Sequence, residues 1–205
     1  MKKMNFLPIA LLSVSVMSTT LNAQTTAKVE ETKEVNSKTT PVKEESFMDR
    51  YYGLKAAYPS ASSVLGDFAA ASNTKEKFME RYNQIKASYP ALTTVYGDYA
   101  GSEYTIEEFV KRYYAIKETY PQLPKLYGEY AASKKTLDEF IKRYNEVKDS
   151  APDLSDYYGQ YAASDNKLAE FSSRYYAIKT SNPDMKGAYG EYAGSTKKLS
   201  VKSAK

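Results

Sequence analysis

Hydrophobic residues recur through most of this chain at the spacing of amphipathic helices. One clear stretch has apolar residues at i, i+4, i+7 and i+11, namely Phe78, Tyr82, Ile85 and Tyr89. That spacing places all four side chains on one helical face. Pro90 follows at once, and proline cannot continue a helix interior. The pattern therefore predicts a long amphipathic helix that ends just before Pro90.

A second, shorter helix is predicted directly after this proline. Its apolar positions, again at helical spacing, are Leu92, Val95, Tyr96, Tyr99 and Ala100. The proline ring suits a turn or the first position of such a helix. The long and the short helix together make a helical hairpin of 31 residues.

The hairpin pattern occurs five times at a constant spacing. Phenylalanine opens each copy, at Phe47, Phe78, Phe109, Phe140 and Phe171. A fixed period of this size is typical of repeat arrays, in which each unit buries its apolar face against its neighbours. The sequence predicts an all-α fold, a right-handed α-solenoid-like array of five 31-residue helical hairpins over residues 41–196. A closed helical bundle is the alternative, and the constant period favours the open stack.

Polar residues mark where the long helices begin. Thr105 with Glu108, and Thr136 with Glu139, form Thr-x-x-Glu capping boxes before the third and fourth copies. In the first copy, residues 40–41 (Thr-Pro) are expected to supply the cap and the first turn. The fifth copy has Lys167 at the threonine position, so its start is less well specified.

Every copy carries a glycine in the predicted short helix. These are Gly66, Gly97, Gly128, Gly159 and Gly190. A glycine inside a helix costs about 1 kcal/mol relative to alanine, so five copies of it indicate a structural reason. A second small residue follows four positions later, and small residues four apart allow helices to approach closely. The glycines are therefore predicted to be structural.

Charged residues recur at fixed places as well. Arginine stands three residues after each opening phenylalanine, at Arg50, Arg81, Arg112, Arg143 and Arg174. An acid follows the glycine in the first, second, third and fifth copies, and Gln160 stands at this position in the fourth copy. We expect a structural ladder of ion pairs along the edge of the core, with the aliphatic stems packed on tyrosine rings. The alternative is a basic stripe that binds an anionic chain.

One position alternates between copies. Five residues after the phenylalanine stand Tyr52, Tyr114 and Tyr176 in the odd copies, and Asn83 and Asn145 in the even ones. This position lies about 140° from the phenylalanine around the helix, away from the apolar face. The three tyrosines are the candidate binding surface; the alternative is that neighbouring hairpins bury them.

The spacing of Gly97, Tyr113 and Pro121 partly resembles tetratricopeptide repeats. The period of 31 is shorter than the 34 residues of that family. Phe109 also stands where the family has alanine. The resemblance is one of architecture over residues 41–196, and it implies a groove that binds a peptide or protein.

The N-terminus has the features of a bacterial-type secretory signal peptide over residues 1–23. Lys2 and Lys3 precede an apolar run that is too short to span a bilayer, and Ala23 ends the segment. Residues 24–40 form a polar linker without aromatic residues, which predicts disorder. Residues 197–205 form a basic tail. We expect an exported protein, periplasmic or extracellular, with no membrane span in its mature chain; N-terminal sequencing of exported material tests cleavage before Gln24.

The amino-acid composition limits the kinds of catalysis that this chain could perform. The chain has no His and no Cys, so it lacks the commonest general base and thiol nucleophile. No catalytic residue, cofactor or metal site is predicted. The formal charge of +4 is spread over interleaved acids and bases, which argues against a nucleic-acid partner. We expect a non-enzymatic protein- or peptide-binding or scaffold module. A surface adhesin for glycan or host protein is the alternative, an enzyme of unknown type a remoter one, and the oligomeric state is not predicted.

Overall fold

A computed structural model describes residues 44–200 of the chain. Within them, ten α-helices and five 3₁₀ segments alternate in regular order, and there is no strand. The all-α prediction is therefore confirmed. The predicted signal peptide, the linker and residues 201–205 of the predicted tail lie outside the described residues.

Each hairpin consists of a long helix, a 3₁₀ segment and a short helix. The long helices are α1 (Phe47–Ala57), α3 (Lys75–Ser88), α5 (Ile106–Thr119), α7 (Leu137–Ser150) and α9 (Leu168–Ser181). The short helices are α2 (Leu65–Ala70), α4 (Tyr96–Gly101), α6 (Tyr127–Ala132), α8 (Tyr158–Ala163) and α10 (Tyr189–Gly194). The 3₁₀ segments between them are η1 (Pro59–Val64), η2 (Thr93–Val95), η3 (Pro124–Leu126), η4 (Pro152–Tyr157) and η5 (Pro183–Ala188).

The caps of the long helices agree with the sequence except in the first copy. Thr105 and Thr136 form the expected capping boxes, and Lys167 gives α9 no side-chain cap. Helix α1, however, begins at Phe47, and its capping box is made by Ser46 with Asp49. The expectation that residues 40–41 supply this cap is wrong, because a nearer hydroxyl satisfies the free N–H groups.

The second half of each hairpin also departs from the expected single short helix. A 3₁₀ segment follows the long helix, and the α-helical part begins one residue before the glycine. Gly97 is therefore the second residue of α4, not a mid-helix residue. The cost of glycine in a helix interior applies less strongly there, and the reason for the glycine must lie in its neighbours.

The opening phenylalanines join one hairpin to the previous one. Each is fully buried, and four of them lie edge-on to an aromatic ring of the preceding short helix, with centroids 5.3–5.5 Å apart. Phe47 of the first hairpin makes the same contact with Tyr192 of the last, at 5.2 Å. The first hairpin therefore packs on the fifth as if it were the next copy.

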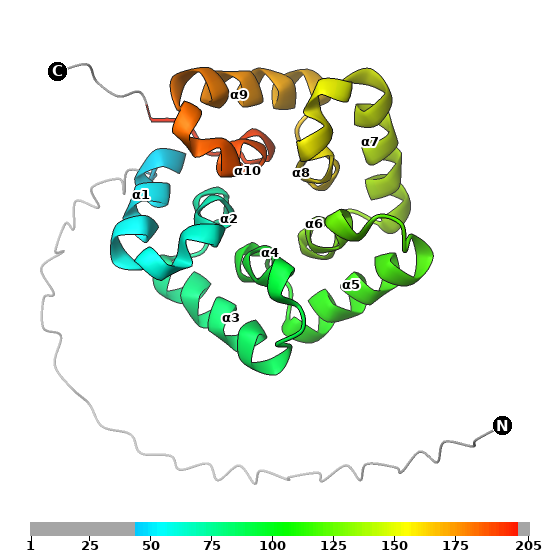
Figure 1. The fold of residues 1–205 in the computed structure, drawn as a ribbon, viewed down its shortest axis with the longest axis horizontal. Helices are drawn as coiled ribbons and strands as arrows, with labels where there is room; N and C mark the ends of the chain where they lie inside the picture. The colour runs from blue at the N-terminus through cyan, green and yellow to red at the C-terminus, as the bar shows by residue number, and fades with distance from the viewer. Residues whose placement is uncertain (1–43, 201–205) are drawn as a thin grey trace, which may run out of the picture. The chain divides into compact units, whose positions relative to one another are not determined.

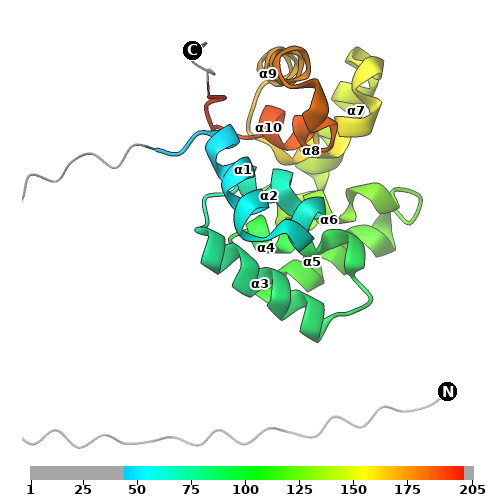
Figure 2. The same cartoon turned by 60° about the vertical axis from the view of Figure 1, so that its left-hand side comes forward.

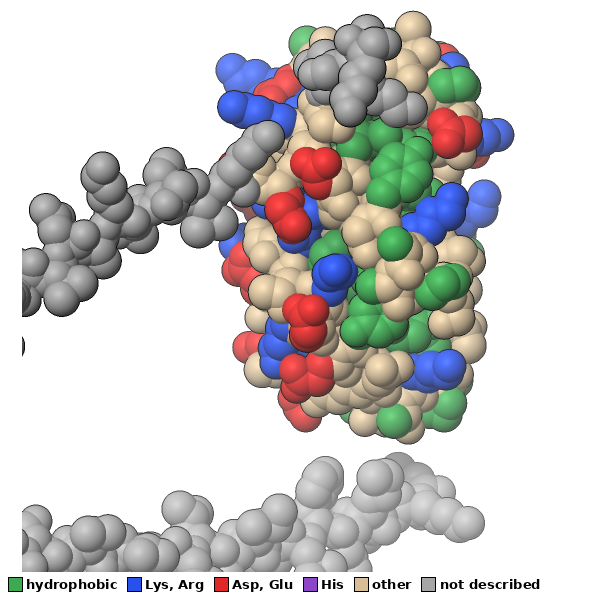
Figure 3. Space-filling view, turned by 90° about the vertical axis from the view of Figure 1, so that its left-hand side faces the viewer, with side chains coloured by type: hydrophobic (Ala, Val, Ile, Leu, Met, Phe, Trp, Pro, Cys, Tyr) green, Lys and Arg blue, Asp and Glu red, His purple; other side chains and the backbone are tan. Residues whose placement is uncertain are grey.

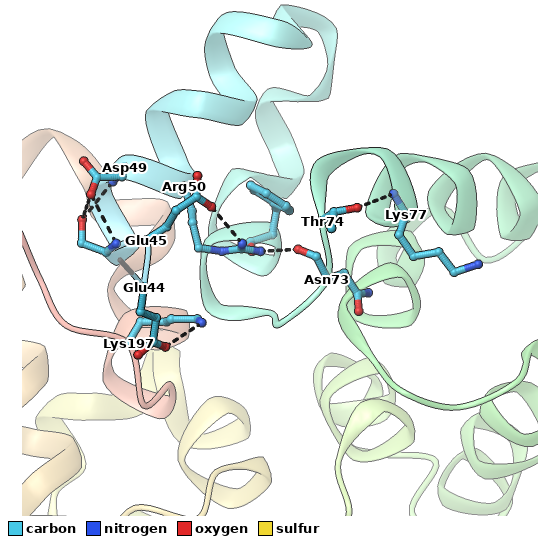
Figure 4. Close-up of polar contacts among 10 residues, drawn as sticks. Glu44, Glu45, Asp49, Arg50, Asn73, Thr74, Lys77 and Lys197 are labelled. Atoms are coloured by element: carbon cyan, nitrogen blue, oxygen red, sulfur yellow. Dashed lines mark hydrogen bonds and ion pairs between the residues drawn. The ribbon is translucent and has the colours of Figure 1, made fainter. Parts of the chain in front are cut away.

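The array closes into a ring (Figure 1), with the short helices around the axis and the long helices outside. Helix α10 packs against α2 as it packs against α8, and α1 lies beside α10 in both ribbon views (Figure 2). The Phe47 N–H donates to the Lys198 carbonyl (2.9 Å), and Lys197 pairs with Glu44 (3.1 Å; Figure 4). The predicted array of five helical hairpins is thus confirmed, and within residues 44–200 it closes on itself instead of forming an open stack.

The repeated arginines cap the short helices. Arg81 donates to the carbonyls of Tyr99 (2.9 Å) and Tyr104 (2.7 Å), and its guanidinium lies 4.2 Å from the centre of the Tyr99 ring. Arg50 repeats the pattern with Phe68 and Asn73 (Figure 4), as do Arg112, Arg143 and Arg174. A cation at a helix C-terminus satisfies carbonyls that lack intrahelical partners.

This capping corrects the predicted ladder of ion pairs. Among the described residues, Arg50 is the one repeat arginine with a carboxylate partner, Glu45 at 3.4 Å. The acids that follow the glycines face the ring axis, away from the arginines. A guanidinium with several donors can serve two or three carbonyls at once, so the arginines have a structural role, as expected, but through the backbone.

Candidate functional site

An axial cavity of about 450 Å³ runs between the five short helices. Its walls repeat with the hairpins, because the residue after each glycine and those three and four positions later face inward. In the second hairpin these are Asp98 and Gly101 of α4 and Ser102, the residue that caps its C-terminus. The other hairpins contribute small residues and serines at the same positions. Residues at i, i+3 and i+4 share one helical face, so this polar, small-residue face is opposite to the core.

A ring of five side chains surrounds the cavity, one from each short helix. They are Asp67, Asp98, Glu129, Gln160 and Glu191. All five are half-buried. We call this set the axial ring. Four like-charged groups around one axis repel one another when ionised, and each has lost part of its hydration.

The axial ring explains the repeated glycines. A Cβ added to Gly97 would meet Cγ of Asp67 at 2.7 Å, and one added to Gly128 would meet Cγ of Asp98 at the same distance. Gly159 lies under Glu129, and Gly190 lies under Gln160. The cycle closes at Gly66, where an added Cβ would lie 3.2 Å from Cγ of Glu191. Each glycine thus makes room for the axial side chain of the preceding hairpin.

The surroundings raise the pKa of every axial carboxyl, chiefly because burial penalises the charged form. The pKa of Asp67 is raised to about 6, that of Glu129 to about 7 and that of Glu191 to about 8. The pKa of Asp98 lies well above its ordinary value, through burial and then repulsion by Glu129, Asp67 and Glu191. These groups therefore hold protons at a pH where exposed carboxyls are ionised.

The axial carboxyls have few partners. The Gln160 amide donates weakly to one oxygen of Glu191 (3.5 Å), and the other oxygen, Oε2, is buried with no hydrogen-bond partner. No lysine or arginine from residues 44–200 lines the cavity. Over the same range, no three carboxylates come together in a way that could hold a metal ion. Among the described residues, protonation of the axial carboxyls is therefore what reduces the repulsion between them.

Sequence reasoning missed the axial ring, although a signal was present. The acids were expected near the arginines at the edge of the core. A polar residue followed by small residues three and four positions later, as in Asp67, Ala70 and Ala71, marks a helical face with no large apolar side chain. Its repetition in five copies indicates a common inward direction once the array is known to close.

The three candidate tyrosines lie on the outer helices and are exposed. Tyr52, Tyr114 and Tyr176 keep 39%, 42% and 45% of their surface accessible, which excludes their burial by neighbouring hairpins. They are the large hydrophobic side chains exposed within residues 44–200. Each lies edge-on to the tyrosine before it, with centroids 5.0–5.3 Å apart. The packed tyrosine holds the exposed ring in place.

A lysine accompanies each exposed tyrosine. The ammonium groups of Lys55, Lys117 and Lys179 lie 5.9, 5.5 and 5.8 Å from the ring centres of Tyr52, Tyr114 and Tyr176. These distances permit a cation–π attraction. The hydroxyl of Tyr176 also donates to Asp153. Each unit therefore presents an aromatic face with a lysine beside it, and the unit of Tyr176 has the Asp153 carboxylate beside it as well.

Ring closure changes how the three tyrosines are arranged. In an open stack they would form a row on alternate hairpins. In the ring, α1 and α9 belong to neighbouring hairpins, whereas α5 is separated from both by the asparagine-bearing α3 and α7 (Figure 1). Tyr52 and Tyr176 therefore lie on adjacent hairpins, and Tyr114 lies on a hairpin that is adjacent to neither of theirs. Figure 3 faces the side of the molecule on which α1 lies, and it shows a band of exposed hydrophobic side chains with charged ones beside it.

No helix within residues 44–200 is long and apolar enough to cross a membrane. Comparison with protein-family models, with curated proteins and with solved structures finds no match to this chain. The partial resemblance to tetratricopeptide repeats therefore gains no support from a family match. The concave groove it implied is replaced by the axial cavity.

Proposed function

We propose that this chain is an exported, non-enzymatic binding module that contacts an acidic segment of a partner protein through its outer face. The contact surface consists of Tyr52 and Tyr176 with Lys55 and Lys179, which we call the tyrosine–lysine pair. One observation carries the proposal. Within residues 44–200, the large hydrophobic side chains that are exposed are the alternating tyrosines, and each has a lysine beside it.

The chemistry of this surface favours a protein segment with carboxylates. Tyrosine gives a large contact area and a polar tip while losing little side-chain entropy. The flanking lysines would attract carboxylates and steer them toward the rings. Asn83 and Asn145 occupy the same position in the even hairpins, so the scaffold does not need tyrosine there. A role outside folding accounts for tyrosines that the fold itself does not require.

Peptide binding tests the proposal directly. Fluorescently labelled 12-residue peptides that alternate Asp or Glu with Leu or Phe would be titrated with the protein, beside charge-reversed peptides that carry Lys. The acidic peptides are expected to bind, and the double variant Tyr52→Asn/Tyr176→Asn is expected to lose at least about tenfold in affinity, as for central aromatic contacts. Tyr114→Asn is the matched control and should bind like the wild type.

Two results would count against this surface. Equal binding of the acidic and the charge-reversed peptides would show that the lysines do not select a partner with carboxylates. If the double variant keeps its affinity and melts within a few degrees of the wild type, Tyr52 and Tyr176 do not contribute to peptide binding. Glycan binding that disappears in the same double variant, without peptide binding, would favour the alternative of a surface adhesin.

A further inference from the structure

The axial ring joins hairpins that the chain does not hold equally. At four of the five junctions the chain runs from a short helix directly into the next long helix. The junction between the fifth and the first hairpin, which we call the seam, has no such link within residues 44–200. It is held by packing, by the Phe47–Lys198 backbone hydrogen bond and by the ion pair between the mostly buried Lys197 side chain and the exposed Glu44.

An axial carboxyl lies in the seam itself. Glu191 of α10 packs over Gly66 of α2, and Ala188 lies against the same glycine, 3.2 Å from its added Cβ. One oxygen of Glu191 is buried without a partner. A charge placed on this group would be poorly solvated, and it would face other carboxylates across the axis.

The groups that face Glu191 offer it no positive charge. They are Asp67 on α2 across the seam, Asp98 on α4, Glu129 on α6, Gln160 on α8 and Tyr157 at the end of η4. The pKa of Tyr157 is raised to about 12, chiefly by burial and then by nearby tyrosines and acids, so this tyrosine is neutral. Lys117 and Lys125 line a separate cavity beside Asp98 and Glu129, on the opposite side of the ring from the seam. Neither lysine is within ion-pair distance of a carboxylate among the described residues.

We propose that the axial ring is a proton-dependent latch, which keeps the seam closed while its carboxyls are protonated and loosens the seam as they ionise. The other four junctions are also linked by the chain, so the repulsion is relieved at the seam, where packing, one backbone hydrogen bond and one ion pair resist it. Opening the seam would let water reach Glu191 and would expose the apolar faces of the first and the fifth hairpin. Closure is thus strongest in mildly acidic solution and weakest in alkaline solution.

The direction follows from proton linkage. The folded ring binds its carboxyl protons more tightly than the unfolded chain, so raising the pH removes stability. The loss begins near the ordinary carboxyl pKa of about 4. It continues through the raised pKa values of about 6 and about 7 to that of Glu191, about 8. This direction is opposite to that of a protein stabilised by ionised acids in salt bridges.

Distance measurements across the seam test the latch. The chain has no cysteine, so spin labels can be placed with Ala56→Cys on α1 and Ser173→Cys on α9, both exposed. The equivalent pair across a covalent junction, Lys111→Cys on α5 with Asp149→Cys on α7, is the control. Between pH 5 and pH 9 the seam distances should lengthen and broaden, whereas the control distances should stay the same.

A neutral replacement separates the latch from general alkaline unfolding. Glu191→Gln keeps the shape and copies the residue that the fourth hairpin already has at this position. It should keep the seam distance short at pH 9 and reduce the alkaline fall in melting temperature, expected to be on the order of 10 °C in the wild type. Glu170→Gln, at an exposed position of α9, should leave both quantities unchanged.

The outcomes are decisive in either direction. A seam distance that is the same at both pH values, or a control pair that lengthens equally, would overturn the latch. If Glu191→Gln folds poorly, the wild-type label pairs still decide, because they need no change in the axial ring. A melting temperature that rises from pH 5 to pH 9 would also overturn it.

Discussion

The seam and the four linked junctions are built from equivalent contacts, but only the linked junctions are also connected by the chain within residues 44–200. Each junction buries a phenylalanine against an aromatic ring of the preceding hairpin, and each places an axial side chain over a glycine. At the seam the glycine is less crowded: the nearest atoms to an added Cβ are 3.2 Å away, whereas at Gly97 and Gly128 Cγ of the axial aspartate lies at 2.7 Å and one of its carboxyl oxygens is nearer still. Repetition of one packing arrangement therefore closes the ring, and the seam differs from the other junctions in its looser packing over the glycine and in having no chain link within residues 44–200.

Removing the fifth hairpin is expected to lower stability more than any substitution proposed for the ring. In an open array, deleting a terminal repeat removes one interface. In the ring, deleting residues 168–205 removes two, because α10 packs on both α8 and α2. We expect a loss of several kcal/mol in the free energy of unfolding and a helical signal that falls by more than the fraction of helix deleted.

Urea unfolding followed by circular dichroism measures that loss. Deletion of the first hairpin, residues 44–74, is the matched control and should cost about the same, because every hairpin in a ring has two neighbours. A truncated protein that melts like the full chain would show that closure contributes little to stability.

Glycine substitutions sharpen the difference between a linked junction and the seam. Gly128→Leu should lower stability by a few kcal/mol, because the side chain would overlap Asp98 and Val95. Gly128→Ala should cost about 1–2 kcal/mol, since its Cβ would lie 2.7 Å from Cγ of Asp98. Gly66→Ala at the seam should be nearly neutral, because helix propensity offsets a milder contact.

Thermal melts of these variants decide between crowding and propensity. Gly53→Ala is the control: nothing lies within 4 Å of an added Cβ there, so the gain in helix propensity should raise stability by up to about 1 kcal/mol. A stabilised Gly128→Leu variant would show that the axial side chains do not require glycine beneath them.

Completing the axial ring with a fifth acid is expected to have the smallest effect, and one confined to high pH. Gln160→Glu places a carboxyl between Glu129 and Glu191. At pH 5 the variant should melt close to the wild type, because the added group is mostly protonated in this setting. At pH 8 it should melt several degrees lower, since a further charge must be accommodated. Equal melting curves at both pH values would mean that the axial groups do not interact.

Much of the local structure could be predicted from sequence, because local rules decide it. Apolar spacing gave the long helices, Thr105 and Thr136 gave two of their starts, and Pro90 explained where one ends. The direction of the alternating tyrosines, away from the apolar face, was also predictable from helical geometry. The start of α1 was misplaced because Ser46 and Asp49 form a Ser-x-x-Asp box, which a search for Thr-x-x-Glu passes over.

The long-range features could not be predicted in the same way, because they depend on how small rotations between hairpins add up over five copies. Spacing along the chain was enough to define the repeat, the helices, the apolar face and the five equivalent positions. Tertiary structure alone decided that the fifth copy meets the first, which turns Asp67 and Glu191 into neighbours although they are far apart in the chain. Tertiary packing also determines that Arg81 donates hydrogen bonds to backbone carbonyls and does not pair with acidic side chains. The physical reason is that closure is a global geometric condition, and no spacing within one 31-residue unit encodes it.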